Sequence, residues 1–229
     1  MNVRWLPKDF IARSSLDLLG GYEQLVGHPV RPPIPVEDII ERYLGLSLTF
    51  EDIETRLGME DVLGATFVRS KTICINEKLL EDKSEGRMMF TCAHEAGHWV
   101  LHRHFIEQAQ RSSQGTEAIV CRTRNSRLPI EWQADFFASC LIMPEEEVRK
   151  AFSLVWDRKE LVLDNVRSCL GGTTVCVDPC VQNWHFIADA VREAGGFINV
   201  SKEAMIIRLR ELGLVLNKTG AHMGWRKSA

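Results

Sequence analysis

The sequence predicts a mixed fold of helices and short strands around one substantial core. Apolar residues recur at helical spacing in several segments of ten residues or more, and short apolar runs between residues 46 and 75 are separated by turn residues. Hydrophobic residues make up 45% of the 229 residues, charged residues make up 26%, and the net charge is −3. These values are ordinary for a globular protein and argue against collagen-like, disordered, coiled-coil and broadly basic nucleic-acid-binding classes.

The first half of the chain alternates between helical and extended patterns. We expect a helix over residues 8–19, which ends at a pair of glycines. Four prolines make residues 28–35 an extended connector, and the last of them begins a helix over residues 35–45. Residues 46–50 predict a strand, and residues 64–75 predict a β-hairpin around a polar turn.

The second half contains three further predicted helices. We expect a buried helix over residues 87–101 and a polar loop over residues 108–127 after it. A helix over residues 129–141 ends before an exposed acidic turn at residues 145–147. A last helix spans residues 201–213, with a serine as its N-terminal cap and a glycine at its C-terminal end.

Targeting features favour the cytoplasm. The sequence has no run of about 18 apolar residues, which is the length that a membrane span needs. Its first residues lack the apolar segment of a signal peptide. The seven cysteines are an odd number in mostly apolar surroundings, as expected of reduced thiols. We therefore expect a cytoplasmic protein with no membrane partner.

The residues that carry chemistry begin with His94, Glu95 and His98, an H-E-x-x-H sequence within a predicted helix. Residues four apart lie on one face of an α-helix, so both imidazoles can reach a single Zn²⁺ at about 2.0–2.1 Å. Glu95 then lies beside the open position of the metal, where it can take a proton from a water molecule. The alternative interpretation is a core helix that contains two structural histidines.

Zinc needs a further protein ligand, and the sequence offers three residues. His104 has the spacing of the third histidine in H-E-x-x-H-x-x-G-x-x-H enzymes, but Leu101 stands where that pattern needs a glycine. His102 would lie about 12 Å along a straight helix from His94. Glu131, on the next predicted helix, completes the His₂Glu set of known catalytic zinc sites. We expect Glu131 to be the third ligand, with His104 next in order.

Asp135 follows Glu131 by one helical turn, so this E-x-x-x-D sequence places two carboxylates on one face of the helix. We expect Asp135 to accept a hydrogen bond from a ligand imidazole and to fix its tautomer. His102 is expected in the surroundings of the ligands, bonded to backbone, a carboxylate or water. The combination of motifs is that of a gluzincin-like metallo-endopeptidase. An amphipathic helix with its acids toward solvent is the alternative, and the neighbouring Trp132 and Phe136 disfavour it.

Three stretches of the sequence resemble the ImmA/IrrE family of zinc metallopeptidases. They are residues 90–102, residues 131–144 and, more weakly, residues 200–215. The resemblance implies an α+β, zincin-like fold, with a small sheet beside the two ligand helices and a small helical subdomain after them. It implies a zinc endopeptidase that cuts helix-turn-helix transcriptional repressors and so relieves repression in phage or mobile-element induction or in stress responses.

Carried over to this chain, the resemblance makes the two histidines of H-E-x-x-H and Glu131 the zinc ligands, and Glu95 the general base. We expect a zinc metallopeptidase domain in residues 1–152 and a mostly helical subdomain in residues 153–229. Ligand type alone also allows Mn²⁺ or Fe²⁺. The hairpin at residues 64–75 is expected to hold the substrate as an added strand.

Two other functions stay open at this point. A regulatory protein could keep the metal helix and bind a repressor or another partner without cutting it, although a pure binder has no use for Glu95. A DNA-binding regulator could use the helix at residues 201–213, with Arg208 and Arg210 as basic contacts. A helix with few basic residues is usually a solvated face, which disfavours direct DNA binding.

The remaining cysteines give a weaker signal. Cys169, Cys176, Cys180 and His185 are candidates for a second, structural zinc site, but their spacing matches no recognised finger. The cysteines at positions 92 and 140 lie inside predicted helices, and we expect them to be packing residues rather than nucleophiles.

Overall fold

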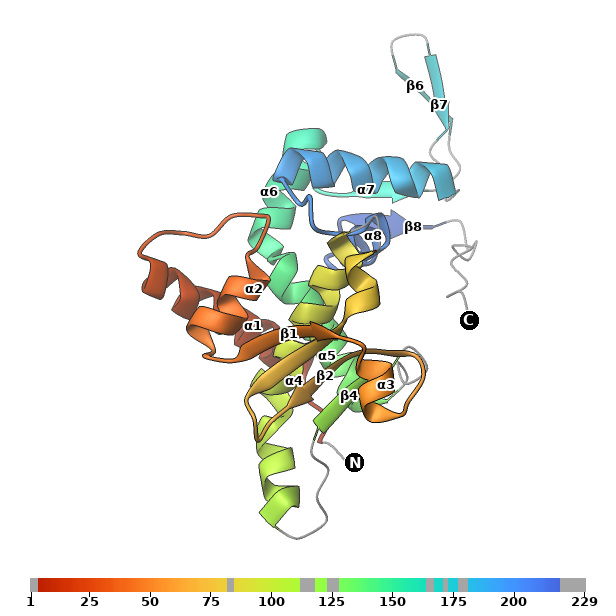
Figure 1. Cartoon of the computed structure of the whole chain (residues 1–229). Helices are drawn as coiled ribbons and strands as arrows, with labels where there is room; N and C mark the ends of the chain where they lie inside the picture. The colour runs from red at the N-terminus through yellow and green to blue at the C-terminus, as the bar shows by residue number, and fades with distance from the viewer. Residues whose placement is uncertain are drawn as a thin grey trace. The chain divides into compact units, whose positions relative to one another are not determined.

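The structure is a computed structural model of the chain (Figure 1). It divides into two compact units, Met1–Pro144 and Glu145–Ala229, which are described separately. The expected domain boundary after residue 152 stays a prediction. Within the ranges described, no helix combines the length and the apolarity that crossing a bilayer requires. The structure describes residues 4–81, 85–111, 118–122, 128–163, 167–170, 173–176 and 181–218.

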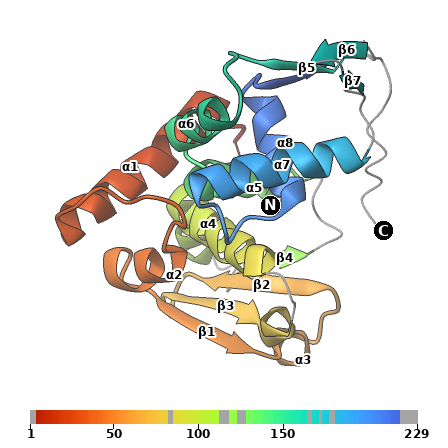
Figure 2. The same ribbon diagram turned by 90° about the horizontal axis from the view of Figure 1, so that it is seen from above.

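A four-stranded sheet forms one layer of the first unit (Figure 2). β1 runs parallel to β3, and β2 runs antiparallel to both β3 and β4. The predicted strand and the predicted hairpin are therefore confirmed, and so is the expectation of an α+β fold. The strands, in their order across the sheet, are β1 (Ser47–Glu51), β3 (Thr72–Asn76), β2 (Val62–Phe67) and β4 (Ala118–Arg122).

The hairpin of β2 and β3 has no open edge, because β1 pairs with β3 and β4 pairs with β2. The expectation that a substrate strand adds to the hairpin is therefore wrong. β4 also differs from the prediction, since residues 118–122 lie inside the expected polar loop. This short segment contains Ile119 and Val120, which favour a strand, but polar residues surround it in the sequence.

The two faces of the sheet pack against different helices. Successive residues of a strand point to opposite faces of the sheet, so neighbouring residues of β2 contact different helices. On one face, Ala65 packs with Ile53 of α3 (Ile53–Leu57). On the other face, Thr66 contacts α4 (Glu85–Arg111), which lies along the sheet in Figure 2.

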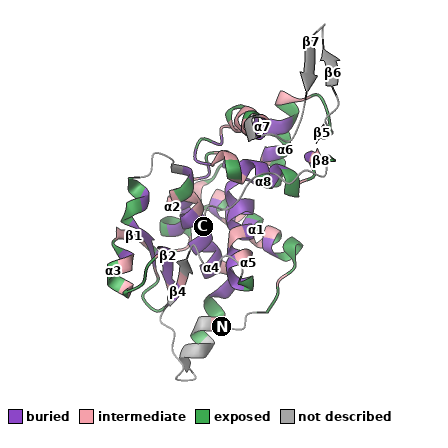
Figure 3. Cartoon of the chain, turned by 90° about the vertical axis from the view of Figure 1, so that its right-hand side faces the viewer, coloured by how far each residue is buried: buried purple, intermediate pink, exposed green. Residues whose placement is uncertain are grey.

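Three long helices, α1 (Lys8–Val26), α4 and α5 (Pro129–Ile142), pack together in this unit. Most residues of α5 and of the central part of α4 are buried, and they are purple in Figure 3. The predicted helices at 87–101 and 129–141 are therefore confirmed, although α4 is longer at both ends. Shorter elements connect this layer to the sheet: α2 (Val36–Asp38), the π-helix η1 (Ile39–Tyr43) and the 3₁₀ helix η2 (Glu77–Leu80).

α1 continues through the pair of glycines at which the sequence predicts its end. It ends instead at Gly27, which has a φ of 78° and caps the helix. A Cβ at Gly21 would collide with the ring of Tyr43, so this glycine allows η1 to approach α1. Tertiary packing therefore outweighs the low helix propensity of glycine, which costs about 1 kcal/mol relative to alanine.

α4 and α5 approach each other closely at Gly97. A Cβ on Gly97 would lie only 3.0 Å from Cδ1 of Phe137, whose side chain is completely buried. The missing side chain thus lets the two helix axes come close together. Gly97 lies between His94 and His98 on α4, so this approach also determines how near both imidazoles lie to α5.

In its described residues, the second unit combines three helices with two pairs of short strands. α7 packs against both α6 and α8, and Phe152, Trp184 and Phe197 are completely or almost completely buried in this unit. β5 pairs with β8 in parallel, and β6 pairs with β7 in antiparallel orientation. The elements are α6 (Glu145–Val155), β5 (Leu161–Leu163), β6 (Arg167–Leu170), β7 (Thr173–Cys176), α7 (Val181–Gly195), α8 (Lys202–Glu211) and β8 (Val215–Asn217).

The ends of α8 follow the prediction, whereas α6 does not. The hydroxyl of Ser201 accepts a hydrogen bond from the backbone N–H of Ala204 at 3.1 Å, as expected of an N-terminal cap. Residues 145–147, predicted as an exposed turn, form the first turn of α6. Three glutamates are favourable there because the helix dipole stabilises negative charge at a helix N-terminus.

A pair of glycine substitutions tests the contact between α4 and α5. Gly20→Ala should raise the free energy of unfolding by roughly 0.5–1 kcal/mol, since a Cβ at Gly20 meets nothing within 4 Å. Gly97→Ala should lower it by about 1–3 kcal/mol, because the buried ring of Phe137 would have to move. Urea unfolding of both variants measures the difference, and equal stabilisation by the two substitutions would contradict the close approach.

Candidate metal centre

α4 and α5 bring three potential metal ligands together. His94 and His98 lie one turn apart on α4, and Glu131 lies in the first turn of α5. One nitrogen or oxygen atom from each residue lies within 4.8 Å of the other two. All three residues are at most 3% exposed. Among the residues that the structure describes, this is the group of histidine, cysteine or acidic side chains that could hold a metal ion.

The distances within this cluster fit a tetrahedral divalent ion. Nε2 of His94 lies 3.3 Å from Oε2 of Glu131, and Nε2 of His98 lies 3.6 Å from Oε1. Ligand atoms around a tetrahedral zinc ion with bonds of about 2.0–2.1 Å are separated by about 3.3 Å. Nε2 of His98 is buried and has no hydrogen-bond partner in the described part of the chain. The donor set, its spacing and this buried lone-pair position therefore fit a divalent metal.

The ionisation of the cluster also suits a metal. Burial lowers the pKa of His98 to about 4, which keeps its imidazole neutral near pH 7. Burial alone would raise the pKa of Glu131, but its contacts with the imidazoles of His94 and His98, at 3.3 and 3.6 Å, outweigh burial and lower it to about 2. Neutral imidazoles and an ionised carboxylate are the forms in which these side chains bind metal ions.

Glu95 lies between α4 and β2 and is completely buried. Oγ1 of Thr66 lies 2.7 Å from Oε2 of Glu95 and 3.1 Å from its backbone oxygen. Gly64 makes room for the carboxylate, since a Cβ there would lie 2.9 Å from Oε1. Burial raises the pKa of Glu95 to about 8. One carboxylate oxygen is therefore held by a hydroxyl, while Oε1 has no hydrogen-bond partner among the described residues.

Asp135 lies one turn after Glu131 and reaches the first histidine. Nδ1 of His94 donates a hydrogen bond to Oδ1 of Asp135 at 2.9 Å. The side chain of Asp135 is 40% exposed, whereas that of His94 is 4% exposed. A carboxylate in this position favours the tautomer of His94 that has its lone pair on Nε2.

His102 lies beside the second histidine. Its Nδ1 lies 3.0 Å from Nδ1 of His98, and its Nε2 lies 3.0 Å from Oε1 of Gln133 on α5. The partner of His102 is therefore an imidazole on one side and an amide on the other, rather than the backbone, carboxylate or water considered from the sequence. His104, the alternative third ligand, is exposed and is not part of the cluster.

Three residues that lie around the ligand cluster and Glu95 were not predicted from the sequence. Gln133 is a neutral polar residue between Trp132 and Ala134 on a mostly apolar helix, and a buried polar residue needs a hydrogen-bond partner. This was the only sequence feature that could have pointed to it. Thr66 and Gly64 lie in a strand in which both residue types are unremarkable. Their role follows from the packing of β2 against α4, which no local pattern encodes.

Most of the candidate second zinc site lies outside the residues and side chains that the structure describes. Cys180 lies outside the described residues, and the side chains of Cys169 and Cys176 are not described. His185 lies on α7, where its Nε2 is 3.9 Å from Oε1 of Glu203. The second site therefore stays a prediction. The cysteines at positions 92 and 140 are buried and are not joined in disulfides.

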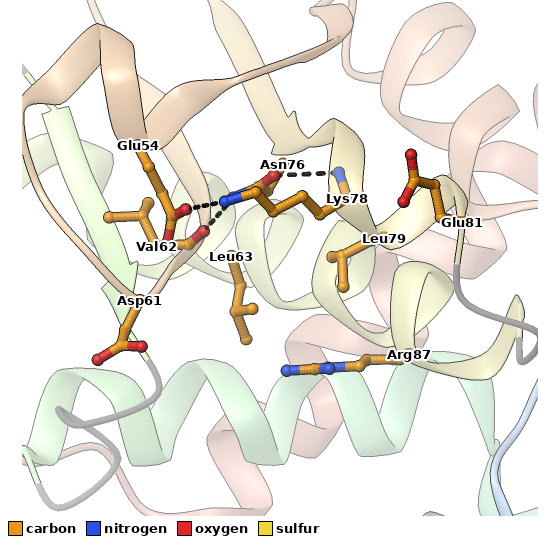
Figure 4. A pocket seen from close by; sticks show the side chains of 9 residues that line it. All are labelled: Glu54, Asp61, Val62, Leu63, Asn76, Lys78, Leu79, Glu81 and Arg87. Atoms are coloured by element: carbon orange, nitrogen blue, oxygen red, sulfur yellow. Dashed lines mark hydrogen bonds and ion pairs between the residues drawn. The ribbon is translucent and has the colours of Figure 1, made fainter.

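A separate pocket of about 440 Å³ opens beside α3, η2 and the start of α4 (Figure 4). Lys78 forms an ion pair with Glu54 at this pocket, and the amide of Asn76 donates to the backbone oxygen of Val62 at 2.8 Å. None of the three clustered ligands lines it. Its polar contacts are thus explained by the local structure, and we assign it no function.

Residues 42–171 match the Peptidase_M78 family, which is described as the IrrE N-terminal-like domain. The chain belongs to this family. The match covers more than half of the chain and contains both ligand helices, and no curated protein matches the chain. As a member of an IrrE-like peptidase family, the chain is a metallopeptidase of the ImmA/IrrE type with a zincin-like core. This supports protease activity on a protein substrate and a divalent metal at the buried cluster.

Proposed function

We propose that the protein is a zinc-dependent endopeptidase that cuts a helix-turn-helix transcriptional repressor. The observation that carries the chemical part is the buried cluster of His94, His98 and Glu131, together with the buried Glu95, which interacts electrostatically with His94 and Glu131. A His₂Glu set is the ligand set of known catalytic zinc sites, which favours Zn²⁺ over Mn²⁺ or Fe²⁺. The substrate class follows from the resemblance to ImmA/IrrE peptidases alone.

In this proposal the three ligand residues hold the ion, and Glu95 moves the proton. When bound, the divalent ion polarises the scissile carbonyl and lowers the pKa of a water molecule in the site. Burial favours the protonated form of Glu95, whereas a cation held by the neighbouring ligands would favour the ionised form. In that ionised form, Glu95 would take the proton from this water and pass it to the leaving amine. The hydroxyl of Thr66 holds Oε2 of Glu95 and so keeps the carboxylate oriented. Asp135 holds the imidazole of His94, and His102 holds that of His98, in each case at the Nδ1 atom of the ligand histidine.

The rival proposals receive less support. A protein that only binds a repressor has no need for a buried carboxylate beside a metal site, because burying such a group costs free energy. A DNA-binding role for α8 loses one of its two proposed basic contacts. Arg208 is 4% exposed, and its guanidinium lies 3.7 Å from Glu211. We also infer a cytoplasmic location, with which the buried free thiols of Cys74 and Cys92 are consistent.

Metal content tests the ligand set. The wild-type protein, purified without added metal or chelator, should contain about one zinc ion for each chain. Glu131→Ala should lose most of it, whereas Glu60→Ala, at an exposed glutamate of the same unit, should retain it. Elemental analysis of the three proteins provides the measurement. Undiminished zinc in Glu131→Ala would show that the third ligand is misassigned.

Glu95→Gln separates an enzyme from a binding protein. The variant should keep its zinc but lose cleavage, because the amide cannot accept the proton from water. Wild type and variant are incubated with a lysate of the source organism, and the newly formed N-termini are labelled and sequenced. New N-termini inside a helix-turn-helix protein, formed by the wild type alone, are the expected result. New N-termini from both proteins would remove Glu95 from its role, and none from either would favour the binding protein.

A further inference from the structure

A continuous series of hydrogen bonds connects His98 with the N-terminal segment of the chain. Nδ1 of His98 lies 3.0 Å from Nδ1 of His102, and Nε2 of His102 lies 3.0 Å from Oε1 of Gln133. The side-chain nitrogen of Gln133 donates to the backbone oxygen of Arg4 at 3.1 Å. The side chains of His98, His102 and Gln133 are completely buried. Each therefore depends on these partners rather than on bulk water.

The backbone oxygen of Arg4 fixes the direction of every bond in this series. A carbonyl oxygen can only accept, so the nitrogen of the Gln133 amide faces Arg4 and its oxygen faces His102. The amide oxygen also only accepts, so His102 carries its proton on Nε2 and, as a neutral ring, offers a lone pair on Nδ1. Nδ1 of His98 then carries a proton, which leaves its lone pair on Nε2. That is the atom facing Glu131.

Stacking contacts hold Arg4 in this position. The indole of Trp5 stacks on that of Trp132, with ring centroids 4.7 Å apart and an interplanar angle of 14°. Trp132 directly precedes Gln133 on α5, so this stacking places the start of the chain next to the amide. Nζ of Lys8 lies 5.1 Å from the ring centroid of Phe136, one turn further along α5. Trp5 is 59% exposed, so it holds the segment at the surface rather than filling the core.

We propose that the segment of residues 4–7 sets the tautomer of His98 through Gln133 and His102, and so presents the lone pair that binds the metal. Arg4, Gln133 and His102 are positioning residues that act through His98. The inference rests on the proposed metal centre. It also explains why position 133 holds glutamine, since the side chain must donate on one side and accept on the other. An ionised glutamate there would face the Arg4 carbonyl with a second acceptor.

The experiment measures the tautomer of His98 and the affinity for zinc in the full chain, labelled with ¹⁵N-histidine. Metal-free wild type should show His98 protonated on Nδ1 and His102 protonated on Nε2 in long-range ¹H–¹⁵N spectra. In Gln133→Met, which removes the acceptor for the Nε2 proton of His102, both tautomers of His98 should appear, and the affinity for Zn²⁺ by chelator competition should fall about 10–100-fold. A single Nδ1-protonated His98 with unchanged zinc affinity in this variant would overturn the proposal.

A second variant keeps the proposal testable if Gln133→Met fails to fold. Trp5→Ala removes the stacking contact that holds the segment but leaves the side chains of His98, His102 and Gln133 unchanged. Without the Arg4 carbonyl the Gln133 amide can turn around, so this variant should mix the His98 tautomers and weaken zinc binding about tenfold. Phe10→Ala, at an aromatic residue of similar exposure (53%) on α1, should behave as wild type. Identical results for Trp5→Ala and Phe10→Ala would overturn the role of the segment. Absence of zinc binding in wild type would contradict the metal centre, while the metal-free tautomers would still decide this inference.

Discussion

The close approach of α4 and α5 at Gly97 is the contact on which the rest of the site depends. Each helix alone carries only part of the ligand set, and neither part can hold an ion in a water-excluded position. Because Gly97 has no side chain, the ring of Phe137 can pack against the α4 backbone between His94 and His98. The same approach places Glu131 within 3.3 and 3.6 Å of the two imidazoles. The missing side chain at Gly97 therefore contributes to the distances between the proposed ligand atoms.

Burial makes His94, His98 and Glu95 each dependent on a partner outside the ligand cluster. His94 has Asp135, His98 has His102, and Glu95 has Thr66. An unsatisfied buried polar group costs about 1–3 kcal/mol, so these partners contribute to stability as well as to orientation. The partners of His94 and His98 also bind the Nδ1 atoms of these histidines, so that the Nε2 lone pairs face the metal position. The site is thus organised by the protein itself.

Features that depend on local spacing could be predicted from the sequence. The two ligand helices, the hairpin and the Ser201 cap follow from periodicity and capping chemistry, although α4 continues to Arg111, well beyond its predicted end. Features that depend on distant segments could not. His102 and Gln133 are 31 residues apart, and Gln133 and Arg4 are 129 residues apart, so no window of sequence relates them. The pairing of β1 and β4 with the two strands of the hairpin could not be predicted for the same reason, because strand order is a tertiary property.

X-ray absorption spectroscopy of the zinc-loaded protein tests the central claim most directly, because it reports the atoms bound to the ion. A His₂Glu site predicts nitrogen and oxygen neighbours at about 2.0–2.2 Å, with the multiple-scattering signature of two imidazoles. It predicts no sulfur neighbour. A sulfur shell at about 2.3 Å, or a spectrum without two imidazoles, would mean that the ion binds elsewhere and would contradict the account.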